Sequence, residues 1–210
     1  MRHRCRVSWA VASLTVAMIG LAGCSFGRQP PTRLYVLTAL PATEVVPAGG
    51  ATHSLAVVVG PVELPQYADR PQVVTGNTSN ELHSAALAQW AEPLADNFAR
   101  VLAENLSLLL GTDRVAVFPW RGPLPMEYQV MVEVTRFLGE PGGEVSLVAL
   151  WSVVGKNGKE VVVSKKSSFS EPTRAQDYEA LAAAMSRTVA ALSRDIATAI
   201  ATDSQKVSSR

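Results

Sequence analysis

The sequence has 210 residues, 48% of them hydrophobic, and its 19 basic and 18 acidic residues give a formal net charge of +1. This composition is typical of one globular domain and excludes a largely disordered chain. Without a basic surplus the chain has little with which to neutralise a phosphate backbone, which excludes nucleic-acid binding as its main role. Histidine and cysteine are scarce, at three and two residues, so neither a metal site nor a thiol enzyme is favoured. We therefore expect no nucleic-acid partner, no metal, no cofactor and no catalysis.

The N-terminus has the pattern of an export signal. Arg2, Arg4 and Arg6 precede an uncharged stretch over residues 7–20, which is too short to span a membrane. The signal ends in Leu-Ala-Gly-Cys24, which resembles the bacterial lipobox, where the cysteine receives a diacylglycerol and becomes the first mature residue. We expect a signal peptide over residues 1–23 and lipidation at Cys24. The alternative is an ordinary signal peptide that happens to end beside a cysteine.

The residues after Cys24 predict how the domain is held. Two or more acyl chains make a stable membrane anchor. Residues 24–32 include Gly27, Pro30 and Pro31 among polar residues, which favours a short tether. By analogy with lipoprotein sorting signals, a serine at position 25 indicates the outer membrane, with the domain facing the periplasm.

Hydrophobic patterning in the first half of the chain predicts short strands and one helix. The helix is expected over Glu92–Leu110, with Pro93 at its first position and Gly111 closing it. Asn105 falls on the apolar face of this helix and is either a buried polar contact point or a side chain satisfied by backbone. Strands are expected at Arg33–Thr38, Ser54–Val62, Gln72–Thr75 and Arg114–Phe118, with a loop over Pro41–Thr52. The helix and the strand after it are expected to form a crossover between parallel strands.

The second half predicts a hairpin-rich sheet followed by a long helix. Alternation from Tyr128, an apolar run over Glu144–Val154 and a strand over Glu160–Phe169 are separated by Gly-rich turns, which favours an antiparallel meander. A helix is expected over Arg174–Thr202, and residues 203–210 are expected to form a flexible polar tail. The predicted fold is an α/β two-layer sandwich, in which two long helices pack on a mixed sheet.

No catalytic set emerges from the sequence. Nucleophile elbows, phosphate-binding loops, dinucleotide fingerprints and zinc motifs are all absent from it. His83 lies two positions after Glu81, a spacing that separates the two side chains on a helix, and no nucleophile accompanies them. Trp151 is expected to pack in the core, whereas Trp90 and Trp120 either pack or line a groove.

Four short stretches together resemble the ABC-type transport auxiliary lipoprotein family, whose members are PqiC-like. They are Glu63-Leu-Pro-Gln-Tyr-Ala-Asp-Arg-Pro-Gln-Val-Val74, Gln89-Trp-Ala-Glu-Pro-Leu94, Arg100-Val-Leu-Ala-Glu-Asn-Leu106 and Val117-Phe-Pro-Trp120. The resemblance covers about residues 33–200, and the family domain is expected over residues 33–202. One departure is Ala68, where a larger apolar residue is expected.

The resemblance implies a non-catalytic subunit of an MCE-type intermembrane lipid transport system that supports membrane integrity. Its partners would be a PqiB-like MCE-domain tunnel protein and the inner-membrane partner of that protein, and the lipoprotein would form a homo-oligomeric ring that receives the end of the tunnel. Tyr67, Asp69, Arg70 and Trp90 are the candidate partner contacts, because loops on a scaffold often carry recognition. The alternative is that Asp69 and Arg70 pair to hold their loop while Tyr67 and Trp90 pack.

Two other functions stay open at this stage. One is a lipoprotein adaptor or activator of another envelope machine, such as a cell-wall synthase or a secretion system, since fold alone does not decide function. The other is a periplasmic hydrolase that uses His83. Partner identity distinguishes the first, and replacement of His83 tests the second.

Overall fold

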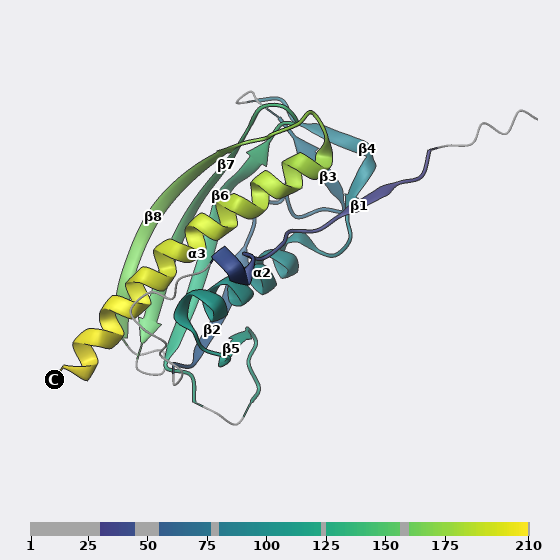
Figure 1. Ribbon diagram of the computed structural model, residues 1–210. Helices are drawn as coiled ribbons and strands as arrows, with labels where there is room; N and C mark the ends of the chain where they lie inside the picture. The colour runs from purple at the N-terminus through teal and green to yellow at the C-terminus, as the bar shows by residue number, and fades with distance from the viewer. Residues whose placement is uncertain (1–29, 45–54, 77–79, 123–124, 156–159, 210) are drawn as a thin grey trace, which may run out of the picture. The chain divides into compact units, whose positions relative to one another are not determined.

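The computed structural model describes residues 30–44, 55–76, 80–122, 125–155 and 160–209. The chain divides into two units, residues 1–31 and 32–210, and the fold lies in the second. Cys24, most of the predicted tether, residues 45–52 of the predicted loop and the turn at 156–159 lie outside the described residues. The strands, shown in Figure 1, are β1 (Arg33–Tyr35), β2 (Val57–Glu63), β3 (Gln72–Thr75), β4 (His83–Trp90), β5 (Val115–Val117), β6 (Tyr128–Gly139), β7 (Glu144–Gly155) and β8 (Glu160–Pro172). The helices are α2 (Leu94–Leu110) and α3 (Tyr178–Ser208), and a 3₁₀ turn, η1, spans Ala42–Glu44.

The larger sheet has five strands in the order β5-β2-β6-β7-β8. β6, β7 and β8 are antiparallel neighbours, which confirms the predicted meander. β2 pairs in parallel with both β5 and β6. Because α2 precedes β5 in the chain, the predicted helical crossover between parallel strands is also confirmed.

Both helices pack on one face of this sheet (Figure 1). Alternate residues of β7 point to that face, and Val145, Leu147, Ala149 and Val153 are fully buried there. From α2, Phe98 meets Phe137 of β6 edge to face, with ring centroids 5.5 Å apart. The helices cover one side of the sheet, and within the described residues no helix covers the other side, which is the predicted two-layer α/β arrangement.

The helix ends follow local backbone chemistry. α2 begins after Pro93, which is its N-cap residue rather than its first helical residue, and it ends at Gly111, whose φ of 65° suits glycine. The side chain of Asp177 caps α3 by accepting a hydrogen bond from the N–H of Ala180 at 2.7 Å. α3 then continues to Ser208, so most of the segment predicted as a flexible tail is helical. The phenol of Tyr128 donates to Asp203 at 3.0 Å and holds this extension against β6.

A second sheet, which the sequence interpretation did not predict, has three strands in the order β1-β4-β3. β4 was missed because its exposed and buried residues do not alternate. Its pairing with β3 slips between Gln72 and Val74, and such an irregularity removes the period of two that identifies a strand. The predicted strand over Gln72–Thr75 is confirmed as β3.

The predicted first strand, Arg33–Thr38, is shorter than expected because the chain leaves the sheet after Tyr35 to bond with the helices. The N–H of Leu37 donates to the side chain of Asn97 at 2.6 Å, and that of Leu40 donates to Asn105 at 2.7 Å. Between them the N–H of Thr38 donates to Ser186 of α3 at 3.1 Å. This segment, residues 37–40, is therefore fixed to both helices by side-chain hydrogen bonds.

Candidate docking surfaces

The loop between β2 and β3 carries three of the four predicted contact residues. Its backbone forms a turn in which the N–H groups of Ala68 and Asp69 both donate to Pro65. The side chains of Asp69 and Arg70 are exposed at this turn and do not form an ion pair with each other. The alternative in which that pair holds the loop is therefore wrong.

Tyr67 holds the same loop from inside. Its hydroxyl accepts a hydrogen bond from the N–H of Phe137 on β6 at 3.1 Å, and its ring packs against the core. β2 stops pairing with β6 at Glu133, so beyond that point the edge of β6 is open to such a side-chain contact. Ala68, smaller than the residue expected there, is buried beside it. Tyr67 thus positions the turn that displays Asp69 and Arg70.

Trp90, the fourth predicted contact residue, lies at the end of β4 and is only 6% exposed. Its side chain belongs to the hydrophobic core, and its backbone N–H donates to the carbonyl of Pro71. Its indole therefore packs and offers no side-chain surface to a partner. Trp151 packs as predicted, and its Nε1 donates to Ser167 at 3.0 Å.

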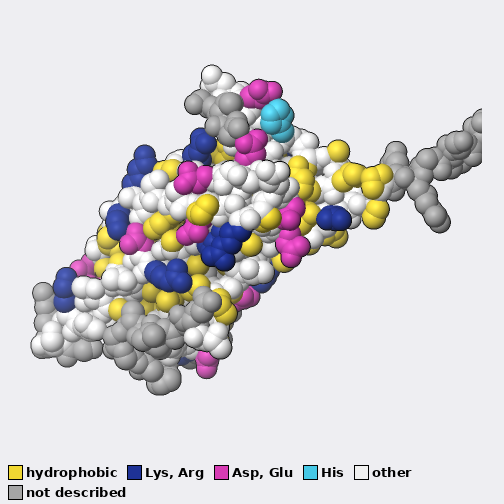
Figure 2. All heavy atoms as spheres, turned by 45° about the horizontal axis from the view of Figure 1, so that its top comes forward, with side chains coloured by type: hydrophobic (Ala, Val, Ile, Leu, Met, Phe, Trp, Pro, Cys, Tyr) yellow, Lys and Arg dark blue, Asp and Glu magenta, His cyan; other side chains and the backbone are white. Residues whose placement is uncertain are grey.

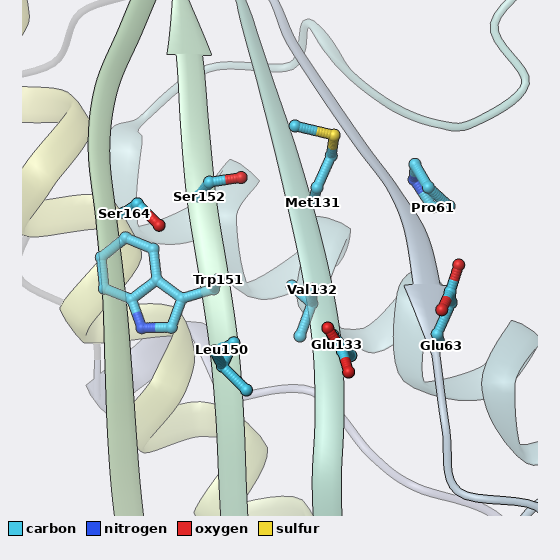
Figure 3. A pocket seen from close by; sticks show the side chains of 9 residues that line it. All are labelled: Pro61, Glu63, Met131, Val132, Glu133, Leu150, Trp151, Ser152 and Ser164. Carbon is cyan, nitrogen blue, oxygen red and sulfur yellow. The ribbon is translucent and has the colours of Figure 1, made fainter.

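The helix-free face of the five-stranded sheet contains a shallow hollow of about 350 Å³, called here the outer-face hollow (Figure 3). Its walls are apolar at Pro61, Met131 and Leu150, and polar at two serines of β7 and β8. Its lining residues are Pro61, Glu63, Met131, Val132, Glu133, Leu150, Trp151, Ser152 and Ser164. An open sheet face with a mixed lining of this kind suits contact with another protein better than enclosure of a small substrate.

Two carboxylates stand side by side in the outer-face hollow. Glu63 on β2 and Glu133 on β6 are directly paired in the sheet register, and Figure 3 shows their side chains together on neighbouring strands. Both are exposed, and neither forms an ion pair with another residue in the described ranges. Like charges directly opposite each other destabilise a sheet. Glu133 pairs in turn with Leu150 of β7, and Leu150 pairs with Lys166 of β8. The acidic pair therefore lies beside an exposed apolar residue, Leu150.

A second hollow, of about 430 Å³, lies at the other end of β2. Phe118 and Trp120 line it together with Val58, Pro125 and Met126, and both aromatic side chains are largely exposed. Trp120 thus faces a groove, whereas Trp90 does not, and the buried Trp151 also borders the outer-face hollow. Sequence reasoning singled out Trp120 but missed Glu63 and Glu133, because their pairing depends on strand register.

His83 and Glu81, the pair considered for catalysis from the sequence, lie close together at the surface. Nε2 of His83, the first residue of β4, lies 3.7 Å from the carboxylate of Glu81, which is not on a helix as the sequence analysis assumes, and both side chains are well exposed. The described part of the chain contains no group of histidine, cysteine, aspartate or glutamate side chains that could hold a metal ion. Within the same residues, no helix is both long and apolar enough to cross a membrane.

A partly exposed polar network joins β8 to α3. Ser167 donates to Asp195 at 2.7 Å, and Lys165 donates to the same carboxylate oxygen at 2.9 Å. Burial alone would raise the pKa of Asp195, but these two hydrogen bonds and the charge of Lys165 outweigh it and hold that pKa below 3.8. The buried hydroxyl of Ser167 accepts from the indole of Trp151 and donates to Asp195, so it links β7, β8 and α3.

Comparisons with known proteins place this fold in a family. A family model described as "ABC-type transport auxiliary lipoprotein component" matches residues 35–197. A crystal structure of an uncharacterised protein has a TM-score of 0.66 at 20% identity and covers 81% of this chain and 99% of its own. A Xanthomonas campestris protein of family DUF330 has a TM-score of 0.66 at 18% identity and covers 85% of this chain and 100% of its own. No curated protein matches the sequence.

Proposed function

Because the chain belongs to the family of ABC-type transport auxiliary lipoprotein components, we propose that it is the membrane-anchored docking subunit of an MCE-type lipid transport system. The family match over residues 35–197 is the observation that carries this proposal. The proposed partner is a PqiB-like MCE-domain tunnel protein, which works with an inner-membrane protein. In this proposal several copies form a homo-oligomeric ring that receives the end of the tunnel and supports membrane integrity.

The proposed anchor is the lipidated Cys24. Removal of residues 1–23 would make this cysteine the N-terminal residue, and residues 24–32 would tether it to the domain over residues 33–202. The lipobox-like Leu-Ala-Gly-Cys24 supports the lipidation, and Ser25 supports the outer membrane as its location. The domain would then face the periplasm.

The proposed role is positional and not catalytic. In the described ranges, Ser167 is bonded to Asp195, His83 and Glu81 are well exposed, and no group of side chains could hold a metal ion. What the fold offers instead is a rigid scaffold with exposed loops and an open sheet face. Such a domain can hold one end of a conduit at a membrane.

The outer-face hollow and the turn at Asp69 and Arg70 are the proposed contact surface for the tunnel protein. The hollow combines apolar walls with the adjacent carboxylates of Glu63 and Glu133. A cation from the partner would relieve the repulsion between them, because opposite charges across an interface fix register and select partners. We therefore expect the tunnel protein to present an apolar segment that carries lysine or arginine.

Crosslinking in intact envelopes tests the function. The wild-type chain and a Cys24→Ala variant would be crosslinked and purified, and their partners identified by mass spectrometry. We expect an MCE-domain protein with the wild type and much less of it with the variant, since loss of the anchor removes the subunit from its membrane. Recovery of a cell-wall synthase or a secretin without any MCE-domain protein would overturn the proposal.

A further inference from the structure

The three-stranded sheet exposes apolar side chains next to the start of the folded unit. Leu34 on β1 and Val36 just after it are 63% and 42% exposed, and Leu87 on β4 is 40% exposed. The parallel register pairs Arg33 with Ala88 and Leu34 with Gln89. Leu87 directly precedes Ala88, so it lies next to the residues of β4 that pair with β1. Leu34, Val36 and Leu87 are called here the β1–β4 patch. Figure 2 shows hydrophobic side chains gathered at this end of the unit.

The β1–β4 patch is almost free of charge. Residues 30–40 carry a single charged side chain, Arg33, and residues 84–90 carry none. Arg33 pairs with Ala88 in the register, so it points to the opposite face of β1 from Leu34, and Glu92, just beyond β4, is paired with Arg100. A bilayer interface accepts such a face, because apolar side chains enter the acyl boundary.

Chain length places the patch near the anchor. Ten residues separate Cys24 from Leu34, and an extended chain spans at most about 3.5 Å per residue, so Leu34 stays within roughly 35 Å of the acylated cysteine. An acyl anchor therefore keeps the patch at a high local concentration of lipid, and the patch need not bind strongly by itself.

We propose that the β1–β4 patch rests on the bilayer that holds the anchor, with Leu34, Val36 and Leu87 inserted at the headgroup–acyl boundary. This inference rests on the lipid anchor of the proposed function. Contact by a tether alone leaves a domain free to turn, whereas contact at the tether and at the patch fixes one face toward the membrane. The helix-free sheet face would then be presented to partners in a constant orientation.

The experiment uses the full lipidated protein in vesicles of phosphatidylethanolamine and phosphatidylglycerol. Cys5 falls in the predicted leader and Cys24 would be acylated, so an introduced cysteine is the only free thiol and can carry an environment-sensitive fluorophore. Leu87→Cys places the label in the patch. Val161→Cys on β8, where valine is 65% exposed, is the matched control. We expect lipids carrying a quencher in the acyl chain to quench the label at position 87 several-fold more than the label at position 161.

A companion variant separates insertion from simple proximity. Leu34→Asp in the Leu87→Cys background should abolish the excess quenching while vesicle flotation persists, because the acyl anchor is intact. Equal quenching at positions 87 and 161 in floating protein contradicts the inference alone. Failure of the protein to float contradicts the anchor, and with it the inference. Disulfide-linked dimers formed through position 87 without lipid quenching would show that the patch contacts a second copy instead.

Discussion

The side-chain oxygen of Asn105 accepts a hydrogen bond from the backbone N–H of Leu40 at 2.7 Å, across 65 positions of sequence. The amide nitrogen of Asn105 donates in turn to Ser193 of α3 at 3.0 Å. A polar residue on the apolar face of α2 is thus satisfied by the N-terminal segment and the second helix together. Asn97, which lies earlier in α2, makes the equivalent contact: its side-chain oxygen accepts a hydrogen bond from the N–H of Leu37. The two asparagines link the segment that follows the tether to the helical layer.

Replacing Asn97 should therefore destabilise the whole domain. Asn97→Ala leaves the buried N–H of Leu37 without its acceptor, and an unsatisfied buried donor costs about 1–3 kcal/mol. Urea unfolding should show a lower midpoint for this variant. Asn80→Ala, at an exposed position, is the control and should leave the midpoint unchanged. Equal midpoints for both variants would mean that water replaces the lost acceptor.

The loop between β2 and β3 should separate into a structural and a recognition part. Tyr67→Phe removes the acceptor for the N–H of Phe137 and should lower the free energy of unfolding by about 0.5–1.5 kcal/mol. Arg70→Ala removes only an exposed side chain, so its stability should match the wild type while crosslinking to the partner falls. A loss of stability in Arg70→Ala equal to that in Tyr67→Phe would show that Arg70 holds the loop.

The elements of the larger sheet could be predicted because their local signals were strong. Apolar runs, Gly-rich turns and the glycine at position 111 mark the meander and the end of α2 without reference to the rest of the fold. β4 could not be predicted in the same way, because an irregular pairing removes its alternation. The end of β1 was misplaced for a different reason, since the chain there bonds with helix side chains that lie far along the sequence.

The candidate surface depended even more on tertiary structure. The motif that contains Tyr67 and Arg70 could be recognised, but nothing in it shows that one side chain points inward and the other outward. Likewise, Glu63 and Glu133 are 70 positions apart, and only the parallel register of β2 with β6 brings them together. Register of distant strands is set by the packed sheet and is not visible in a local pattern.

Stability should depend on pH through Asp195. Its pKa is lowered in the folded state, so the bonds from Ser167 and Lys165 add stability above the unfolded pKa of about 3.8, and this stability is lost as the pH falls through the folded pKa. The free energy of unfolding of Asp195→Asn should therefore differ most from that of the wild type above about pH 5, and this difference should shrink below about pH 4. Urea unfolding across this range measures it. Lys165→Met removes one of the two donors to Asp195, so the stability of this variant should depend less on pH over the same range.

The C-terminal turns of α3 should be held by Asp203. Burial raises the pKa of Tyr128 above its ordinary 10.0, and the hydrogen bond to Asp203 raises it further, so the phenol stays protonated and donating at neutral pH. Asp203→Ala should cost roughly 1 kcal/mol and should speed amide hydrogen exchange in the last turns of α3. Gln205→Ala, at an exposed position on the same turns, is the control. Fast exchange already present in the wild type would restore the prediction of a flexible tail.

The acidic pair of the outer-face hollow should show opposite effects on stability and on binding. Glu133→Gln keeps the shape of the side chain but removes its repulsion with Glu63, so the free energy of unfolding should rise by about 0.2–1 kcal/mol. If a partner cation normally neutralises the pair, the same change should weaken crosslinking to the tunnel protein, because that cation loses one of its carboxylates. Glu144→Gln, exposed at the start of β7 and outside the hollow, should alter neither property. A more stable variant with undiminished crosslinking would place the partner on another surface. A variant that loses both stability and crosslinking would mean that Glu133 supports the sheet itself.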